Sequence, residues 1–561
     1  MKKSNLGQAE RKGSSPMYKV KEEKDVHIKM RDGIRLAADI RRPDAQGKFP
    51  ALLAMCPYSK EVQSLPLPPQ HRGSPLWFGS LEAGDSEYFV SRGYVHVIAD
   101  IRGTGYSEGE YWNMFSRKEQ EDGYDLVEWL AQQDWCDGNV GMVGISYFAI
   151  IQYLVAAQQP PHLKAIFPLD GWGDLYRDIA YHGGMLNAAF FRYLWSSEIA
   201  ATGNVSAMEK TISSEQLKGL IEEAKSNEDL RINPFLYVIL ANPQMNPMLF
   251  DLMLNPNDGP FYWERSAYTK YDKIKIPVYL GSRWDGFFLH LPGALKGYMG
   301  IDTPKKLIIT PRSYERPWHE YHELVVKWYD YWLKGIDTGI MDEPPIKMFV
   351  RGANQWRFEN EWPLARTEWT KLYLRSHKRL LREPESYSHE PDCFVHQSPV
   401  ITFDIHPLEY LSPPMPQDME LTGPIALYLY ASIDTPDTNW IVTLSDVDMR
   451  GLATKLTGGW LKASHRILDE DKSKPWQPCH TFMAPQPVVP GQIHEYAIEI
   501  TPTSNVFKAG HRLKLEIKSS DFSMENPRFY HLPSSKATLH KIYHDKEHPS
   551  HLLVPVIPQN P

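Results

Sequence analysis

Alternating apolar and polar positions divide the first part of the chain into short strands and helices. The segment VHIKMRDGIRLAADIRRP alternates around an Asp-Gly turn and predicts a β-hairpin. The segments FPALLAMC, VHVIADI and NVGMVGI are nearly continuous apolar runs, which suit strands buried on both faces of a parallel sheet. GYDLVEWLAQQ and AIIQYLVAAQQ have helical spacing. This alternation of strands and helices predicts an α/β fold with a parallel sheet.

The strand pattern disappears between residues 174 and 270. MLNAAFFRYLWSSEIA, SSEQLKGLIEEAKSN and NPMLFDLMLN read as amphipathic helices separated by Asn and Pro turns. A helical insertion between sheet strands usually covers the crevice at their carboxyl ends, so we expect a cap. The strand pattern resumes in IPVYLGSRWDG and KKLIITP, and HELVVKWYDYWLKG predicts the last helix of this unit.

The remainder of the chain consists of short strand patterns with turn signals, which predict an all-β sandwich or jelly roll. We therefore expect five segments. They are a flexible tail over residues 1–17, an α/β core over 18–173 and 271–344, a helical cap over 174–270, and a β domain over 345–561.

Composition excludes several classes of protein. The 561 residues are enough for about three or four structural units. Sixty-one Lys and Arg against 69 Asp and Glu give a net charge of −8, which argues against a nucleic-acid or membrane partner. The four cysteines form no C-x-x-C pair, so we expect neither a disulfide scaffold nor a zinc site. With no secretory signal pattern and no long apolar run, the sequence predicts a cytoplasmic protein with reduced thiols.

The most informative motif is a serine between a buried strand and an apolar helix. Gly144-Ile145-Ser146 ends the strand NVGMVGI, and the helix begins at once. This is the arrangement of a nucleophile elbow, in which a sharp turn exposes the serine and the next backbone N–H helps to form an oxyanion hole. Phe148 stands where the pattern G-x-S-x-G has its second glycine. The alternative is a serine that only caps the following helix.

A serine nucleophile needs a base and an acid that orients it, and on an α/β sheet these follow on later strands. Asp285 comes directly after the buried strand in IPVYLGSRWDG, although Asp-Gly is also an ordinary turn dipeptide. The histidine is expected after the strand KKLIITP. His319 and His322 both lie there, three residues apart, so on a helix only one of them would point at the serine.

Further motifs are spread along nearly the whole chain. They are the elbow Gly144-Ile145-Ser146-Tyr147-Phe148-Ala149, the segment Arg102-Gly103-Thr104-Gly105-Tyr106-Ser107, the helix WYDYWLKG at 328–335, Thr422-Gly423-Pro424 and Ala509-Gly510-His511-Arg512-Leu513. On these residues the chain resembles the cocaine esterase, α-amino-acid ester hydrolase and X-prolyl dipeptidyl peptidase family. The resemblance implies an α/β-hydrolase core with an inserted helical cap and a C-terminal β jelly-roll domain. Ala149 replaces the last glycine of the family's G-x-S-Y-x-G elbow.

The resemblance also implies roles for single residues. It gives the hydroxyl of Tyr58, in Cys56-Pro57-Tyr58, a place in the oxyanion hole, and it makes Asp285 the acid of the triad. The family usually carries its histidine in G-P-W-x-H, and aligning Thr310-Pro311 with that motif places Tyr314 where histidine is expected. We favour His319, which precedes the regular helix, with His322 as the alternative. An incomplete triad would instead indicate a binding or other non-hydrolytic role on the same fold.

Together these features predict a serine hydrolase that cleaves an ester or acyl-amide bond of a small molecule through an acyl-enzyme. Ser146 is the expected nucleophile, His319 the base and Asp285 its partner, while Tyr58 and the Tyr147 backbone N–H stabilise the oxyanion. X-prolyl dipeptidyl peptidase activity is the alternative. No cofactor or metal is implied.

Substrate and assembly are less constrained. Trp77, Trp172 and Trp284 are candidates for an acyl pocket, and core packing is an equal alternative for each. The acyl group, the leaving group and the oligomeric state, a homo-oligomer included, stay open.

Overall fold

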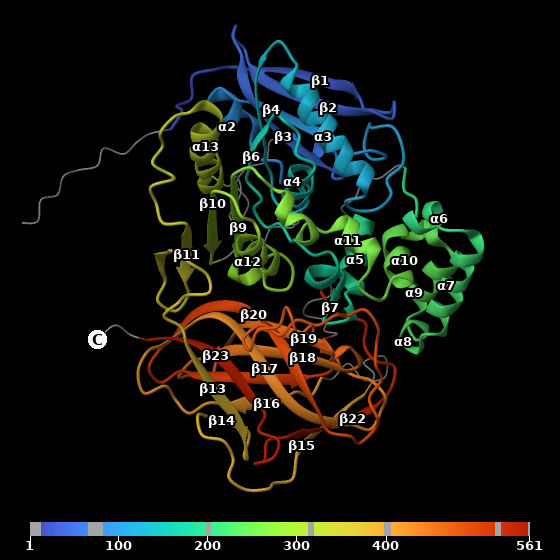
Figure 1. Cartoon of the computed structure of the whole chain (residues 1–561), viewed down its shortest axis with the longest axis vertical. Coiled ribbons are helices and arrows are strands. Elements are labelled where there is room, and N and C mark those ends of the chain that lie inside the picture. Colours follow the sequence, from blue (N-terminus) through green and yellow to red (C-terminus); the bar gives the residue numbers. More distant parts are fainter. Residues whose placement is uncertain are drawn as a thin grey trace, which may run out of the picture.

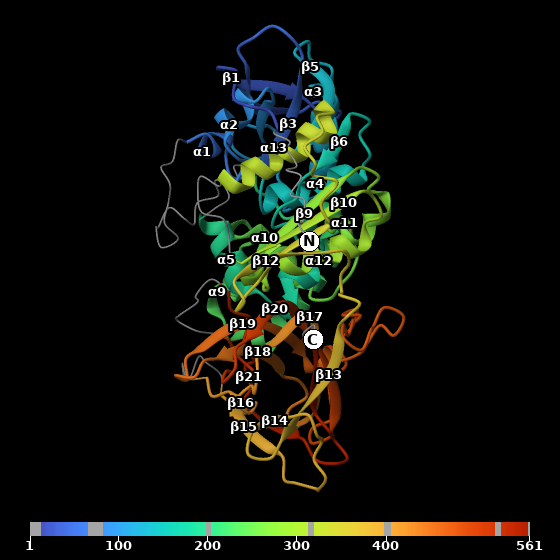
Figure 2. The same cartoon turned by 90° about the vertical axis from the view of Figure 1, so that its left-hand side faces the viewer.

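The computed structural model describes residues 13–65, 82–197, 203–311, 319–397, 405–521 and 529–558; residues 193–197 and 319–320 are described by their backbone alone. The α/β part lies at the top of Figure 1 and the C-terminal β part at the bottom. The helices from α6 (Ala207–Thr211) to α10 (Pro247–Leu254) project to one side of the α/β part in Figure 1. The view turned by 90° in Figure 2 shows the same two-part arrangement.

A mixed sheet forms the centre of the α/β part. Its strand order is β1-β2-β4-β3-β5-β6-β9-β10-β11-β12. All pairings from β4 through β11 are parallel, whereas β1–β2, β2–β4 and β11–β12 are antiparallel. The strands are β1 (Val20–Lys29), β2 (Arg35–Pro43), β3 (Phe49–Cys56), β4 (Val95–Asp100), β5 (Cys136–Met142), β6 (Leu163–Ile166), β9 (Val278–Arg283), β10 (Lys305–Thr310), β11 (Ile346–Val350) and β12 (Gln355–Glu359).

Helices cover both faces of this sheet. Helix α3 contacts α4, and both α4 and α12 contact the 3-10 helix Tyr268–Lys273, whereas α2 contacts α13. They are α2 (Ser86–Ser91), α3 (Arg117–Ala131), α4 (Tyr147–Ala157), α12 (Leu291–Gly300) and α13 (His319–Lys334), and α1 (Lys60–Gln63) is a single turn after β3. Every residue of α4 is buried, as its continuous apolar sequence predicts. The predicted α/β core is confirmed.

The segment between β6 and β9 is mainly helical, as its apolar spacing predicts. After a π-helical turn (Tyr176–Ala180) and the two-residue strands β7 (Tyr181–His182) and β8 (Met185–Leu186), it continues as helices. They are α5 (Ala188–Ser197), α6 (Ala207–Thr211), α7 (Ser214–Ser226), α8 (Glu228–Arg231), α9 (Pro234–Ala241), α10 (Pro247–Leu254) and α11 (Pro260–Arg265). The Asn and Pro residues that separate the predicted helices stand at the starts of helices. Asn233 and Asn246 accept backbone N–H groups as caps, and proline takes the first helical position.

The C-terminal part is one sheet of antiparallel character that closes on itself. Its order is β15-β22-β17-β20-β19-β18-β21-β16-β14-β13-β23, and the additional pairing β17–β23 closes the circle. The strands are β13 (Glu368–Arg375), β14 (Arg379–Leu381), β15 (Asp392–His396), β16 (Leu408–Leu411), β17 (Met419–Ile433), β18 (Asn439–Val447), β19 (Ala453–Lys462), β20 (His494–Phe507), β21 (Arg512–Lys518), β22 (Thr538–Tyr543) and β23 (His551–Ile557). The closed arrangement leaves few strand edges exposed.

Two expected boundaries differ from the structure. The β domain was expected from residue 345, but β11 pairs in parallel with β10 and β12 pairs with β11, so the first sheet extends to Glu359. The expected flexible tail reaches residue 17, but Ser14 Oγ donates a hydrogen bond of 2.7 Å to Asp330 on α13. Residues 1–12 lie outside the described part of the chain. No described helix combines the length and apolar character that a membrane crossing requires.

Candidate active site

Ser146 lies at a strained turn between β5 and α4. Its backbone has φ 61° and ψ −116°, a conformation that L-residues rarely adopt outside special turns. The hydroxyl makes no capping hydrogen bond to α4, and the side chain is partly exposed among buried neighbours. The Ser146 N–H donates to the Leu169 carbonyl at 3.1 Å, which fixes the turn to the strand end beside it. The turn therefore presents the serine instead of using it to cap the helix.

Gly144 explains why the elbow tolerates Phe148. The φ of Gly144 is +123°, and a Cβ built there would lie 2.4 Å from the Cβ of Phe148. The missing side chain of Gly144 thus leaves room for the aromatic residue that replaces the second glycine of the pattern. The Gly144 N–H donates to the Tyr321 hydroxyl at 3.1 Å, so the first turns of α13 contact the elbow.

The residue after the serine is anchored in the core. Tyr147 is 1% exposed, and its hydroxyl donates to the two carboxyl oxygens of Glu119 at 2.9 and 3.0 Å. Glu119 is fully buried, and burial raises its pKa to about 8. The Tyr58 ring lies edge-on to Tyr147, with centroids 5.7 Å apart, and 6.3 Å from Phe148. Tyr58 thus packs against both residues that follow Ser146.

Asp285 follows β9 in a short 3-10 turn and belongs to a charged network. The Arg283 guanidinium donates to Asp285 at 3.2 Å and to Asp170 at 2.9 Å. The Ser282 hydroxyl also donates to Asp170 at 2.9 Å. Although burial opposes ionisation, the Arg283 charge holds the pKa of Asp170 below its usual range. Arg283 thereby holds the loop that carries Asp285 against the end of β6.

These residues all follow strands that end at one edge of the sheet. Tyr58 follows β3, Ser146 follows β5, Asp170 follows β6 and Asp285 follows β9. The strands lie in the order β3-β5-β6-β9 and are parallel, so their carboxyl ends share one edge. Functional side chains of α/β enzymes gather at this edge.

The structure describes the side chain of only one of the two candidate histidines, His322. His319 is the first residue of α13, but its side chain lies outside the described residues. His322 is 1% exposed and accepts the Asp85 N–H on Nε2 at 2.9 Å. Its ring packs against Tyr88 and Phe89, with both centroids 5.2 Å away. His322 is therefore engaged at the start of α2.

Sequence comparison adds the family to this geometry. Residues 32–313 match the model of the X-Pro dipeptidyl-peptidase (S15 family), and residues 338–553 match that of the X-Pro dipeptidyl-peptidase C-terminal non-catalytic domain. The chain belongs to the S15 family. This membership confirms the expected resemblance and makes the protein a serine hydrolase.

Individual proteins similar to this S15 family hydrolase agree with its assignment as a serine hydrolase. A cocaine esterase of a Rhodococcus species is 26% identical over 95% of this chain and 98% of its own length. The crystal structure of a CocE/NonD family hydrolase from Staphylococcus aureus superposes with a TM-score of 0.77 at 26% identity, covering 96% of this chain and 93% of its own. An α-amino acid ester hydrolase, at 19% identity and a TM-score of 0.71 over 99% of both chains, shares the fold.

The tryptophans proposed for a pocket have different positions in this S15 family hydrolase. Trp77 lies outside the described residues. Trp172 is 1% exposed and packs edge-on against Phe115 at 5.1 Å. Trp284 is also 1% exposed, and its indole N–H donates to the Phe349 carbonyl at 2.7 Å. Both described rings pack in the core, and their contact with a substrate stays a prediction.

Sequence reasoning missed Glu119 and Asp170. Glu119 precedes the serine by 27 positions in the sequence, in the first turn of α3, where an acidic residue is usually a solvated partner of the helix dipole. Asp170 stands in Leu169-Asp170-Gly171 after β6, and a strand followed by Asp-Gly was the available signal.

Proposed function

We propose that the protein hydrolyses an ester or acyl-amide bond of a small molecule, with Ser146 as the nucleophile. The observation that carries this proposal is the strained turn at Ser146, whose hydroxyl is not used to cap α4. A φ of 61° at a non-glycine residue costs free energy, and such strain is typical of functional positions. Ser146 directly follows the end of the central strand β5, and Asp285 lies at the same sheet edge, which supports acyl transfer.

The proposed reaction has two halves. Ser146 Oγ attacks the substrate carbonyl carbon while His319 takes its proton, and the oxyanion accepts hydrogen bonds from the Tyr58 hydroxyl and the Tyr147 N–H. Collapse of the resulting tetrahedral intermediate breaks the bond to the leaving group, which takes the proton from the imidazolium. Water then attacks the acyl-enzyme with the same base, and the acid and free Ser146 are released. Asp285 stabilises the imidazolium in both halves.

We choose His319 as the base because of the contacts that His322 and Tyr321 make. His322 is buried, and its Nε2 accepts the Asp85 N–H, so using that nitrogen as a base would leave the partly buried Asp85 N–H without its acceptor. His319 stands one helical turn earlier, at the start of α13, and Tyr321 of the same turn contacts Gly144 of the elbow. The first turn of α13 is therefore close enough to the elbow to supply the base.

Dipeptidyl-peptidase activity is the second candidate, and the name of the matching family favours it. The cocaine esterase relative, similar over nearly its whole length, favours an ester substrate instead. Turnover of p-nitrophenyl acetate and p-nitrophenyl butyrate, compared with Gly-Pro-p-nitroanilide, separates the two. We expect the esters to be hydrolysed with a burst of p-nitrophenol, and the anilide to be turned over at least about 10²-fold more slowly.

The matched control is Ser146→Ala, which removes one oxygen and should leave the thermal midpoint within about a degree. It should abolish turnover of all three substrates. Preferred turnover of the anilide would establish the peptidase. Full activity of Ser146→Ala would remove the serine from the mechanism.

A further inference from the structure

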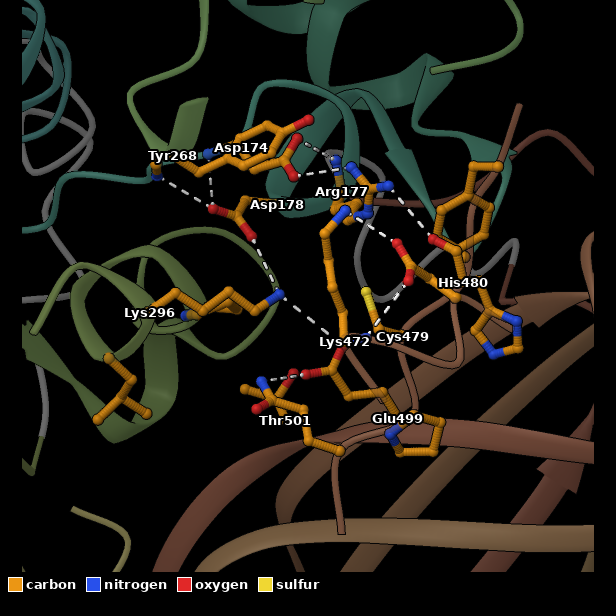
Figure 3. Close-up of a pocket in the computed structure, with 18 of the residues that line it drawn as sticks. Asp174, Arg177, Asp178, Tyr268, Lys296, Lys472, Cys479, His480, Glu499 and Thr501 are labelled. Atoms are coloured by element: carbon orange, nitrogen blue, oxygen red, sulfur yellow. Dashed lines mark hydrogen bonds and ion pairs between the residues drawn. The ribbon is translucent and has the colours of Figure 1, made fainter. Parts of the chain in front are cut away.

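A partly open cavity whose described lining does not include Ser146 lies between the α/β part and the C-terminal sheet. It has a volume of about 640 Å³, within the usual range for small-molecule sites. The π-helical turn, α12, β20 and the loop 469–483 contribute to its lining, and Ser146 is not among the described lining residues. Figure 3 shows charged side chains from these separate elements converging on one space. The cavity therefore depends on both parts of the chain.

Three charged groups in the cavity have hydrogen-bonding capacity to spare. Lys296 of α12 reaches between Asp178 of the π-helical turn and Glu499 of β20 (Figure 3). Its Nζ is 3.8 Å from a carboxyl oxygen of each, beyond hydrogen-bond distance. Asp178 is 1% exposed; its Oδ2 accepts two backbone N–H groups, while Oδ1 has no hydrogen-bond partner among the described residues. Such a buried acceptor calls for a donor.

Arg177, the other main cation of the wall, is paired through its two terminal nitrogens, while its Nε has no hydrogen-bond partner among the described residues. Arg177 pairs with Asp174 at 3.0 Å and with Asp258 at 2.8 Å, and it also donates to the His480 carbonyl. These contacts hold the π-helical turn against the C-terminal part. Lys472 pairs with Asp469 at 2.8 Å, and its side chain is 70% exposed at the rim. Among the described lining residues, the charged groups nearest to one another with unused hydrogen-bonding capacity are therefore the Lys296 ammonium and the Asp178 and Glu499 carboxylates.

The rest of the wall is largely aromatic. Rings from the cap, from the loop after β9 and from the C-terminal part line the space, among them Trp263, Tyr268, Phe287, Trp460, Trp476 and Phe482. A mainly apolar wall with a few converging polar groups is the usual composition of a site for a small organic molecule. Flat rings of this kind pack well against the C–H faces of cyclic ligands.

We propose that this cavity is a second binding site for a small neutral polyhydroxylated molecule of the sugar type. Each hydroxyl of such a ligand both donates and accepts, so it can donate to Asp178 Oδ1 or Glu499 and accept from Lys296. The two carboxylates disfavour an anionic ligand, and the Lys296 ammonium between them offsets part of their attraction for a cationic one. This site does not depend on the proposed esterase function, because it shares no described residue with the Ser146 site.

Three hexoses of nearly equal size test the ligand class. Isothermal titration calorimetry on the full Ser146→Ala chain would compare D-glucose, D-glucosamine and D-glucuronate. We expect D-glucose to bind with a dissociation constant of about 1 mM, a common scale for weak sites, and D-glucuronate to bind at least about tenfold more weakly. No heat of binding with D-glucose, or binding of D-glucosamine alone, would overturn the proposal.

Two variants locate the binding. Glu499→Gln should weaken D-glucose binding at least about tenfold, whereas Glu495→Gln, the same change at an exposed position of β20 outside the cavity lining, should leave it unchanged. Lys296→Met should also weaken D-glucose binding, although the same change would strengthen binding of a cation. Thermal midpoints near wild type establish that the variants fold. Equal binding by Glu499→Gln and Glu495→Gln would place the sugar elsewhere and contradict the proposal.

Discussion

Replacing Gly144 with alanine tests the geometry that the elbow imposes on Ser146. The new Cβ would lie 2.4 Å from Phe148 Cβ, 2.8 Å from its Cγ and 3.1 Å from its Cδ1. Apolar carbons pack at about 3.5–4.0 Å, so Phe148 or the elbow backbone must move by about 1 Å. The φ of +123° is also unfavourable for alanine, at a cost of about 1–3 kcal/mol.

The expected result is a loss of both activity and stability. A displacement of about 1 Å at a reacting group can reduce turnover about 10²-fold. We therefore expect kcat for p-nitrophenyl acetate to fall about 10²-fold in Gly144→Ala, with a lower thermal midpoint. Steady-state kinetics and differential scanning calorimetry on the same preparation measure the two effects.

Gly219→Ala is the matched control. Gly219 lies within helix α7, has no atom within 4 Å of an added Cβ, and is far from the elbow in the sequence. Alanine should stabilise the helix there by about 0.5–1 kcal/mol and leave kcat unchanged. Wild-type kcat and stability in Gly144→Ala would show that the backbone conformation and the Phe148 contact described for the elbow are wrong.

Four further substitutions test other parts of the account. Tyr58→Phe should lower kcat by about 10²–10³ with little change in KM, the scale of one oxyanion donor; a change in KM alone would make Tyr58 a pocket wall. His319→Ala should lower kcat at least about 10³-fold, whereas His322→Ala should lower it less than about tenfold but reduce the thermal midpoint, because the Asp85 N–H loses its acceptor. The opposite ranking in kcat would make His322 the base. Since burial raises the pKa of Glu119 to about 8 from an ordinary value of about 4.3, the folded state holds its proton where the unfolded state has lost it. The thermal midpoint of wild type should therefore fall relative to Glu119→Gln as the pH rises from about 5 to about 8, and parallel pH profiles would contradict this.

Much of the fold was predictable because burial leaves a clear pattern in the sequence. Strands β3 and β4 are nearly continuous apolar runs and are buried almost throughout, and α4 is apolar except for Gln152. The end of the first sheet was not predictable in the same way. Strand β11 alternates buried and partly buried residues, like a strand of the C-terminal sheet, and periodicity does not say which sheet a strand joins.

The candidate site, too, was predictable from the sequence only in part. Ser146 and Asp285 could be proposed because each follows a buried strand in a recognisable dipeptide or tripeptide. Glu119 could not, because its role depends on the contact with Tyr147, which lies 28 residues further along the chain. The Arg283 bridge from Asp170 to Asp285 likewise joins residues that are 115 positions apart and that meet only because β6 and β9 are neighbours.

The most direct test of the central claim is covalent labelling of the serine. A fluorophosphonate reacts with a serine hydroxyl that a neighbouring base activates, and it leaves ordinary serines unmodified. Intact-mass measurement and peptide mapping should find one adduct per chain, on Ser146, and none in Ser146→Ala. An adduct on another residue, or hydrolysis of esters by a chain whose Ser146 stays unmodified, would contradict the account.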